Sequence, residues 1–100
     1  MLGIIKIGIL GGDNCPACFT QDQQLKKEEI AHQVFKIHTP QGKYFSAVLK
    51  AQSIPIVFYY REHGEKSATF NGAYMHSIVH SFRAGLIPVA KIVKKLGELK

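Results

Sequence analysis

The chain has 100 residues, of which 46% are hydrophobic and 20% are charged. This composition excludes disordered, collagen-like and low-complexity proteins, and the length fits one domain over residues 1–100 with a single core. The net charge of +6 comes from lysines that are scattered rather than clustered, so we expect no nucleic-acid partner.

The first six residues are mostly apolar, but Lys6 interrupts the run. The stretch is too short for a membrane span, and it lacks the basic region and the cleavage pattern of a secretory signal. We therefore expect a cytoplasmic protein without a membrane partner. We also expect it to be a monomer.

Strand and helix signals alternate in the first half of the chain. The patterns predict a strand over 3–10, a loop over 11–14, a helix over 16–31, a strand over 33–38, a turn over 39–42 and a helix over 43–52. The side chains expected to face inward are Phe19, Leu25 and Ile30 on the first helix, and Phe45, Val48 and Leu49 on the second.

The second half is predicted to begin with a hairpin and to end with two helices. We expect strands over 56–60 and 67–71 around a turn at 61–66, a helix over 74–84, and a last helix after Pro88. Gly85 suits the left-handed end of the first of these helices. The order β-α-β-α-β-β-α-α predicts an α/β fold with a mixed four-stranded sheet and helices on its faces.

The two cysteines, Cys15 and Cys18, stand at the start of the first predicted helix in the sequence Cys-Pro-Ala-Cys. At this spacing they share one face, with Cα atoms roughly 5–6 Å apart, which is the span of a disulfide. Unpaired N–H groups and the helix dipole favour the thiolate of an exposed Cys15. Pro16 fits the first helical position. The pattern predicts thiol–disulfide exchange, in which Cys15 attacks and Cys18 resolves.

Four landmarks in order along nearly the whole chain resemble the glutaredoxins of the thioredoxin superfamily. They are the motif at 15–18, the Ser-Ile-Pro at 53–55, the Phe-Asn-Gly-Ala at 70–73, and Gly85. The resemblance implies a thioredoxin-like sheet of order 2-1-3-4 and a cis Pro55 that lies against the cysteines. It also implies a substrate groove, and the residues expected to line it are Pro16, Ile54, Pro55, Gly72 and Ala73.

Several positions depart from the glutaredoxin pattern. Asp13 stands where many members have a basic residue, and its negative charge would raise the pKa of a nearby thiol. Ala17 replaces an aromatic residue, Ala73 replaces a glycine, and residues 74–76 lack the acidic side chains that hold the amino group of glutathione. The resemblance implies reduction of protein or mixed disulfides, with glutathione or thioredoxin reductase as the reductant. No tightly bound cofactor is expected, and glutathione is the candidate co-substrate.

Two other interpretations remain open at the level of the sequence. His76 and His80, four apart on the predicted helix, could join the two cysteines as zinc ligands, although more than fifty residues separate the pairs. A cluster of iron and sulfur shared between two chains is the related alternative. The other interpretation is a redox-silent binding module on the same fold. We expect oxidoreductase activity and no bound metal.

Overall fold

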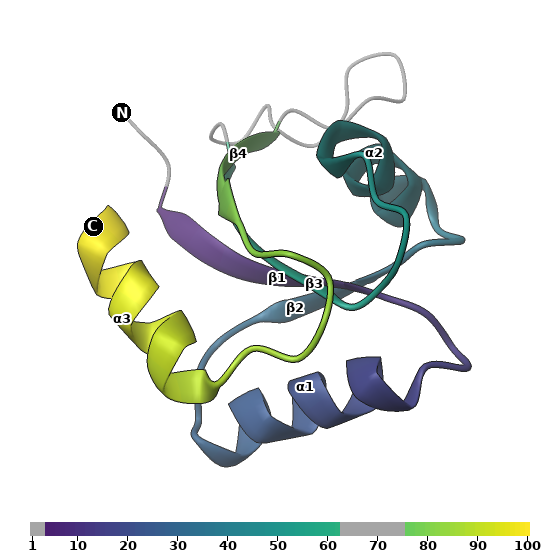
Figure 1. Cartoon of the computed structure of the whole chain (residues 1–100). Helices are drawn as coiled ribbons and strands as arrows, with labels where there is room; N and C mark the ends of the chain where they lie inside the picture. The colour runs from purple at the N-terminus through teal and green to yellow at the C-terminus, as the bar shows by residue number, and fades with distance from the viewer. Residues whose placement is uncertain (1–3, 63–75) are drawn as a thin grey trace.

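The computed structural model describes residues 4–62 and 76–100. The elements in these two ranges are β1 (Ile5–Gly11), α1 (Pro16–Lys27), β2 (Gln33–Lys36), α2 (Pro40–Leu49), β3 (Ile56–Glu62), β4 (His76–Ser81) and α3 (Val89–Leu99). The strands form a mixed sheet of order β2-β1-β3-β4 (Figure 1). The expected fold class and strand order are therefore confirmed.

The central strand β1 runs parallel to β2 and antiparallel to β3, and β3 runs antiparallel to β4. Helix α1 makes the crossover between the two parallel strands, as a parallel pair requires. Gly8 faces Phe58 across β1 and β3, and a Cβ atom at Gly8 would lie 2.6 Å from the tip of that ring. Glycine at this position therefore makes room for an aromatic residue inside the sheet.

The sheet separates two apolar layers, because neighbouring side chains of a strand point to opposite faces. Helices α1 and α3 cover one face, and α2 covers the other (Figure 1). The first layer consists of Ile7, Ile9, Leu25, Val57, Tyr59 and Ile92. The second consists of Leu10, Phe35, Phe45, Ile56, Phe58 and Tyr60. Each helix contributes a buried residue to the layer that it covers.

Helix α1 differs from its prediction in length and in one inward residue. It ends at Lys27, four residues earlier than expected, and Ile30 is half-buried beyond its end. Leu25 is buried as predicted, but Phe19 is 65% exposed. The inward face is set by Cys18, Gln21 and Leu25, so Phe19, one residue after Cys18, points outward.

Helix α2 begins at Pro40, where the sequence predicted a turn. Thr39 caps it by accepting a hydrogen bond from the Gly42 N–H at 3.1 Å, and Pro40 occupies the first turn. The helix ends at Leu49, three residues earlier than expected, and Lys50 caps it in the left-handed conformation. Phe45 is buried as predicted, whereas Val48 is 47% exposed. The prediction for Val48 was therefore wrong.

The helix predicted over 74–84 is not formed, because β4 occupies His76–Ser81 and pairs with β3. Ile78 packs against one apolar layer and Val79 against the other, as neighbours in a strand do. The predicted turn at 61–66 is wrong at its start, since β3 continues to Glu62. The predicted strand at 67–71, together with Gly72 and Ala73, lies outside the described residues.

Helix α3 follows Pro88 as predicted and packs on the first apolar layer. Ile92 is buried, Val93 is 48% exposed, and three other apolar residues of the helix are partly buried: Val89, Leu96 and Leu99. No helix in the described ranges is long and apolar enough to cross a membrane.

Candidate active site

The two cysteines are joined in a disulfide at the start of α1, with their Cα atoms 5.2 Å apart. Cys15 is the N-cap residue, and its Sγ accepts a hydrogen bond from the Cys18 N–H at 3.1 Å. Pro16 follows in the first turn, as the sequence predicted. Cys15 is half-buried, whereas Cys18 is only 5% exposed. The pair therefore has an outer and an inner sulfur.

Two glycines bring the loop before Cys15 close to its neighbours. A Cβ atom at Gly11 would lie 3.4 Å from the Cβ of Cys18, and one at Gly12 would lie 2.9 Å from Cδ1 of Ile54. The chain from Gly11 to Gly12 thus runs between the disulfide and the loop that precedes β3. In that loop the Ile54–Pro55 bond is cis, as the resemblance implied, and Pro55 is buried.

Gly85 lies beside Pro55 rather than at the end of a helix. Its N–H donates a hydrogen bond to the Pro55 carbonyl at 2.8 Å, and its φ of +132° is one that glycine readily adopts. The sequence indicated a positive φ at Gly85. It also predicted a helix before this residue, so it did not predict that Gly85 lies beside Pro55. The described part of the chain therefore places Gly85 at the site. Gly72 and Ala73, which were expected there, fall outside that part.

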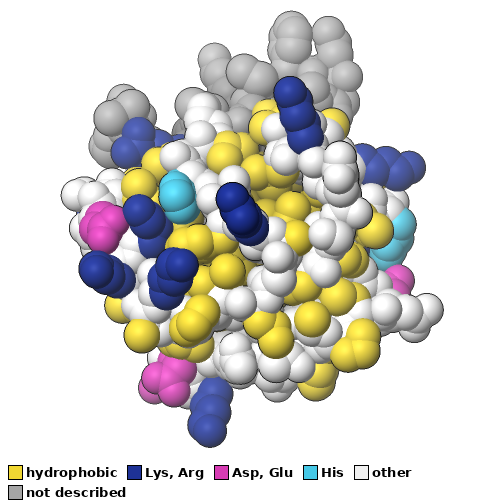
Figure 2. Space-filling model, viewed as in Figure 1, with side chains coloured by type: hydrophobic (Ala, Val, Ile, Leu, Met, Phe, Trp, Pro, Cys, Tyr) yellow, Lys and Arg dark blue, Asp and Glu magenta, His cyan; other side chains and the backbone are white. Residues whose placement is uncertain are grey.

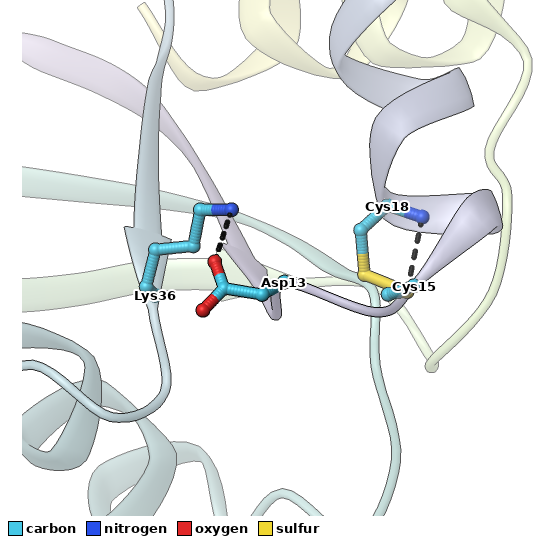
Figure 3. Close-up of a disulfide and its surroundings, with 4 residues drawn as sticks. All are labelled: Asp13, Cys15, Cys18 and Lys36. Atoms are coloured by element: carbon cyan, nitrogen blue, oxygen red, sulfur yellow. Dashed lines mark hydrogen bonds and ion pairs between the residues drawn. A yellow bond between two sulfur atoms is a disulfide. The ribbon is translucent and has the colours of Figure 1, made fainter.

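Asp13 and Lys36 form an ion pair beside the disulfide (Figure 3). Nζ of Lys36 lies 3.0 Å from Oδ1 of Asp13, and Nδ1 of His38 lies 3.7 Å from the other carboxylate oxygen. The hydrogen bond and the charge of Lys36 lower the pKa of Asp13 from its ordinary value. The negative charge of Asp13, which was predicted to disfavour a nearby thiolate, is thus balanced by Lys36. The sequence did not predict that Lys36, at the end of β2, lies at this site.

A pocket of about 590 Å³ opens between α1 and β2, with the disulfide at one end. The exposed ring of Phe19 forms part of its wall, together with Asp22 of α1 and His32, which precedes β2. Nε2 of His32 lies 2.6 Å from the Asp22 carboxylate, and Nδ1 lies 2.8 Å from the Ile30 carbonyl. The pocket therefore has a mixed lining, in which Phe19, Ile30 and Val34 stand beside Asp22 and His32, and it includes both cysteines.

The proposed zinc ligands are not brought together as the helical spacing suggested. Cys15 and Cys18 are bonded to each other, and the ring of His80 packs against Tyr59 and Phe82. His76 and His80 lie on a strand, with a bulge between their pairing partners. Within residues 4–62 and 76–100, no group of three or more His, Cys, Asp or Glu side chains could hold a metal ion.

Comparisons with known proteins agree with this geometry at the level of the fold. No protein-family model and no curated protein sequence matches the chain. Among solved structures, the chain is similar to the solution structure of a thioredoxin from Thermus thermophilus, with a TM-score of 0.58 and 13% sequence identity over 95% of this chain and 72% of that one. The fold is therefore thioredoxin-like, and it carries a Cys-x-x-Cys disulfide at the start of α1.

Proposed function

We propose that this chain is a dithiol–disulfide oxidoreductase that reduces protein or mixed disulfides. The observation that supports it most directly is the Cys15–Cys18 disulfide at a helix start, with one half-buried and one buried sulfur. The cis Pro55, which approaches the same loop through Ile54, adds to that support. A structural role explains the disulfide less well, because a bond that closes so short a loop adds little stability.

In the reduced protein, Cys15 is the proposed nucleophile. Its thiolate attacks one sulfur of the substrate disulfide, and the other substrate sulfur leaves as a thiolate. Cys18 then loses its proton to solvent and attacks Sγ of Cys15, which releases the second substrate thiolate and forms the Cys15–Cys18 bond. Two electrons pass from the protein to the substrate, and an external dithiol, or two thiols, must return them.

The start of α1 favours the thiolate form of Cys15. The Cys18 N–H that donates to the Cys15 sulfur would hold a thiolate more strongly than a neutral group, since hydrogen bonds to charged acceptors are stronger. The positive end of the helix dipole acts in the same direction. Lys36 offsets the opposing charge of Asp13.

The proposed substrate groove lies between the cysteines and the cis Pro55. Pro16 borders it on the helix side, Ile54 offers its backbone groups to an extended substrate, and Gly85 lies behind Pro55. From the sequence landmarks, we also propose that a small thiol such as glutathione contacts Gly72 and Ala73. We also propose that the protein is a cytoplasmic monomer.

The proposal is tested by turnover of insulin disulfides with dithiothreitol as the electron source. Replacement Cys15→Ser should abolish turnover, while Thr20→Ala, an exposed change on the same helix, should leave it unchanged. Wild-type protein that turns over insulin no faster than Cys15→Ser would exclude the activity and favour the redox-silent module.

The glutaredoxin-like character of the protein is tested separately by its electron source. We expect turnover with glutathione, glutathione reductase and NADPH to exceed turnover with thioredoxin reductase and NADPH. The reverse order would retain the oxidoreductase and replace the glutaredoxin-like assignment with a thioredoxin-like one.

A further inference from the structure

A second pocket, of about 440 Å³, lies between the end of β4 and α3 and shares no residue with the pocket at the disulfide. Its lining consists of His80, Ser81, Phe82, Arg83, Ile87, Lys91 and Lys95. Figure 2 shows several Lys and Arg side chains gathered around a histidine over this part of the molecule. Nothing in the proposed exchange reaction uses these residues.

The pocket has an excess of positive charge. Arg83, Lys91 and Lys95 line it, and among the described residues no acidic side chain does. Glu98 pairs with Lys95 at 2.9 Å, but neither Arg83 nor Lys91 forms an ion pair within the described ranges. Arg83 and Lys91 thus bring two positive charges to one hollow without an acidic partner in those ranges, and a bound anion would pair with them.

Two further observations concern the charge around the pocket. Burial lowers the pKa of His80 and the charge of Lys95 lowers it further, while Glu98 opposes the shift. Lys91 stands in the first turn of α3, where the helix dipole disfavours a cation and where no acidic residue compensates. An anion bound beside Lys91 would offset this unfavourable interaction with the helix dipole.

One wall of the pocket is apolar. The rings of His80 and Phe82 meet edge to face, 5.1 Å apart, and Ile87 adjoins them. Nζ of Lys91 stands 5.7 Å from the centre of the Phe82 ring. The pocket therefore has an apolar wall beside its basic side chains.

We propose that this pocket binds a nucleoside phosphate, with the phosphates on Arg83, Lys91 and Lys95 and the organic part against Phe82 and Ile87. The guanidinium of Arg83 matches phosphate oxygens in a two-pronged geometry, and the lysines add point charges. In a nucleoside diphosphate, the phosphates would supply negative charge for the basic side of the pocket, and the base would supply a flat ring for the apolar side.

The test is titration of the oxidised protein with ADP, followed by calorimetry and by the ring signals of His80 in NMR. We expect Arg83→Ala and Lys91→Ala each to weaken ADP binding by about tenfold, the cost of one charged hydrogen bond. Lys43→Ala, which removes an exposed charge from α2, should not. Bound ADP should also raise the pKa of His80, because its phosphates stabilise the imidazolium near Lys95 and Glu98.

Several results would overturn the proposal. One is equal weakening by Lys43→Ala, which would indicate diffuse attraction to a basic protein. Others are no ADP binding at millimolar concentration, and binding of inorganic triphosphate as tight as that of ADP. Binding of an acidic peptide or of anionic vesicles without ADP binding would assign the surface to a macromolecule. Because the oxidised protein is used, failure here is distinct from failure of the exchange activity.

Discussion

The Asp13–Lys36 pair sets the local charge around the first cysteine. The carboxylate of Asp13 stands two residues before Cys15, and a like charge near a thiolate raises the pKa of the thiol. Nζ of Lys36 lies 3.0 Å from that carboxylate and lowers its pKa, so the carboxylate stays ionised. The positive charge of Lys36 also offsets the negative charge of Asp13. Both side chains are exposed, so salt weakens the effect.

We predict opposite shifts in the pKa of Cys15 when either partner is removed from the reduced protein. Lys36→Ala leaves Asp13 unbalanced and should raise the pKa of the Cys15 thiol by roughly half a unit, whereas Asp13→Asn should lower it by a similar amount. The pH dependence of alkylation by iodoacetamide measures both, with Lys43→Ala as the control for net charge. A Cys15 pKa that stays the same in both variants would show that the pair does not act on the sulfur.

Asp22 makes a contribution to stability that depends on pH. Partial burial raises its pKa, but hydrogen bonds from His32 and Lys26 and their charges outweigh burial, and the net pKa lies below the ordinary value of 3.8. A group whose pKa is lowered by folding stabilises the protein above its unfolded pKa of about 3.9, and this contribution is lost as the pH falls toward the folded pKa.

We therefore expect Asp22→Asn to lower the free energy of unfolding by about 1–3 kcal/mol at pH 7, since it weakens a partly buried hydrogen bond to a carboxylate. The difference from the wild type should shrink below about pH 4, where the wild-type carboxylate becomes protonated. Urea denaturation at pH 7 and pH 3 measures this difference in the free energy of unfolding. Asp13→Asn, a change at an exposed position, should lower the free energy of unfolding less at pH 7. A difference that grows on acidification would contradict the assignment.

Gln21 is the residue through which α1 holds the rest of the site. Its side chain is fully buried; Nε2 donates to the Ile87 carbonyl at 3.1 Å, and Oε1 accepts from the Ile87 N–H at 2.7 Å. The loop from 82 to 88 also bonds to Pro55 through Gly85. Gln21 thus links the helix that carries the cysteines to the loop that holds the cis proline.

We predict that Gln21→Leu lowers the free energy of unfolding by about 2–4 kcal/mol, because both backbone groups of Ile87 lose their partner in a buried place. Gln23→Leu makes the same change at an exposed position of α1 and should have a small effect. Urea denaturation of the three proteins compares them. Equal stability of the two variants would mean that water replaces the Gln21 hydrogen bonds.

Local sequence patterns predicted some elements well and others poorly, for identifiable reasons. The buried runs of β1 and β3 and the proline at the start of α1 leave few alternatives, and they were predicted close to their observed bounds. Thr39-Pro40 suits a turn as well as a helix start, so the beginning of α2 was misplaced. Residues 78, 79 and 82 are spaced as on a helix, and only pairing with β3 makes this segment a strand.

At the scale of the whole molecule, strand direction assembles the site. Strands β1, β2 and β4 run the same way and β3 runs against them, so three strand ends and the start of β3 meet at one edge of the sheet. Four segments distant in sequence meet there: those that carry Cys15, Lys36, Pro55 and Gly85. The sequence alone predicted the cysteine pair from local spacing, whereas the cis Pro55 came from the resemblance. Lys36 could not be found, because its position depends on the pairing of β1 with β2.

The central claim is that Cys15 is the sulfur that attacks and Cys18 the one that resolves. The most direct measurement is mass spectrometry under non-reducing conditions after each single-cysteine variant meets a disulfide-bonded protein such as insulin. Cys18→Ser should accumulate a mixed disulfide at Cys15, since nothing remains to release it, and Cys15→Ser should accumulate none. Equal trapping by the two variants, or trapping by Cys15→Ser alone, would contradict the assigned roles.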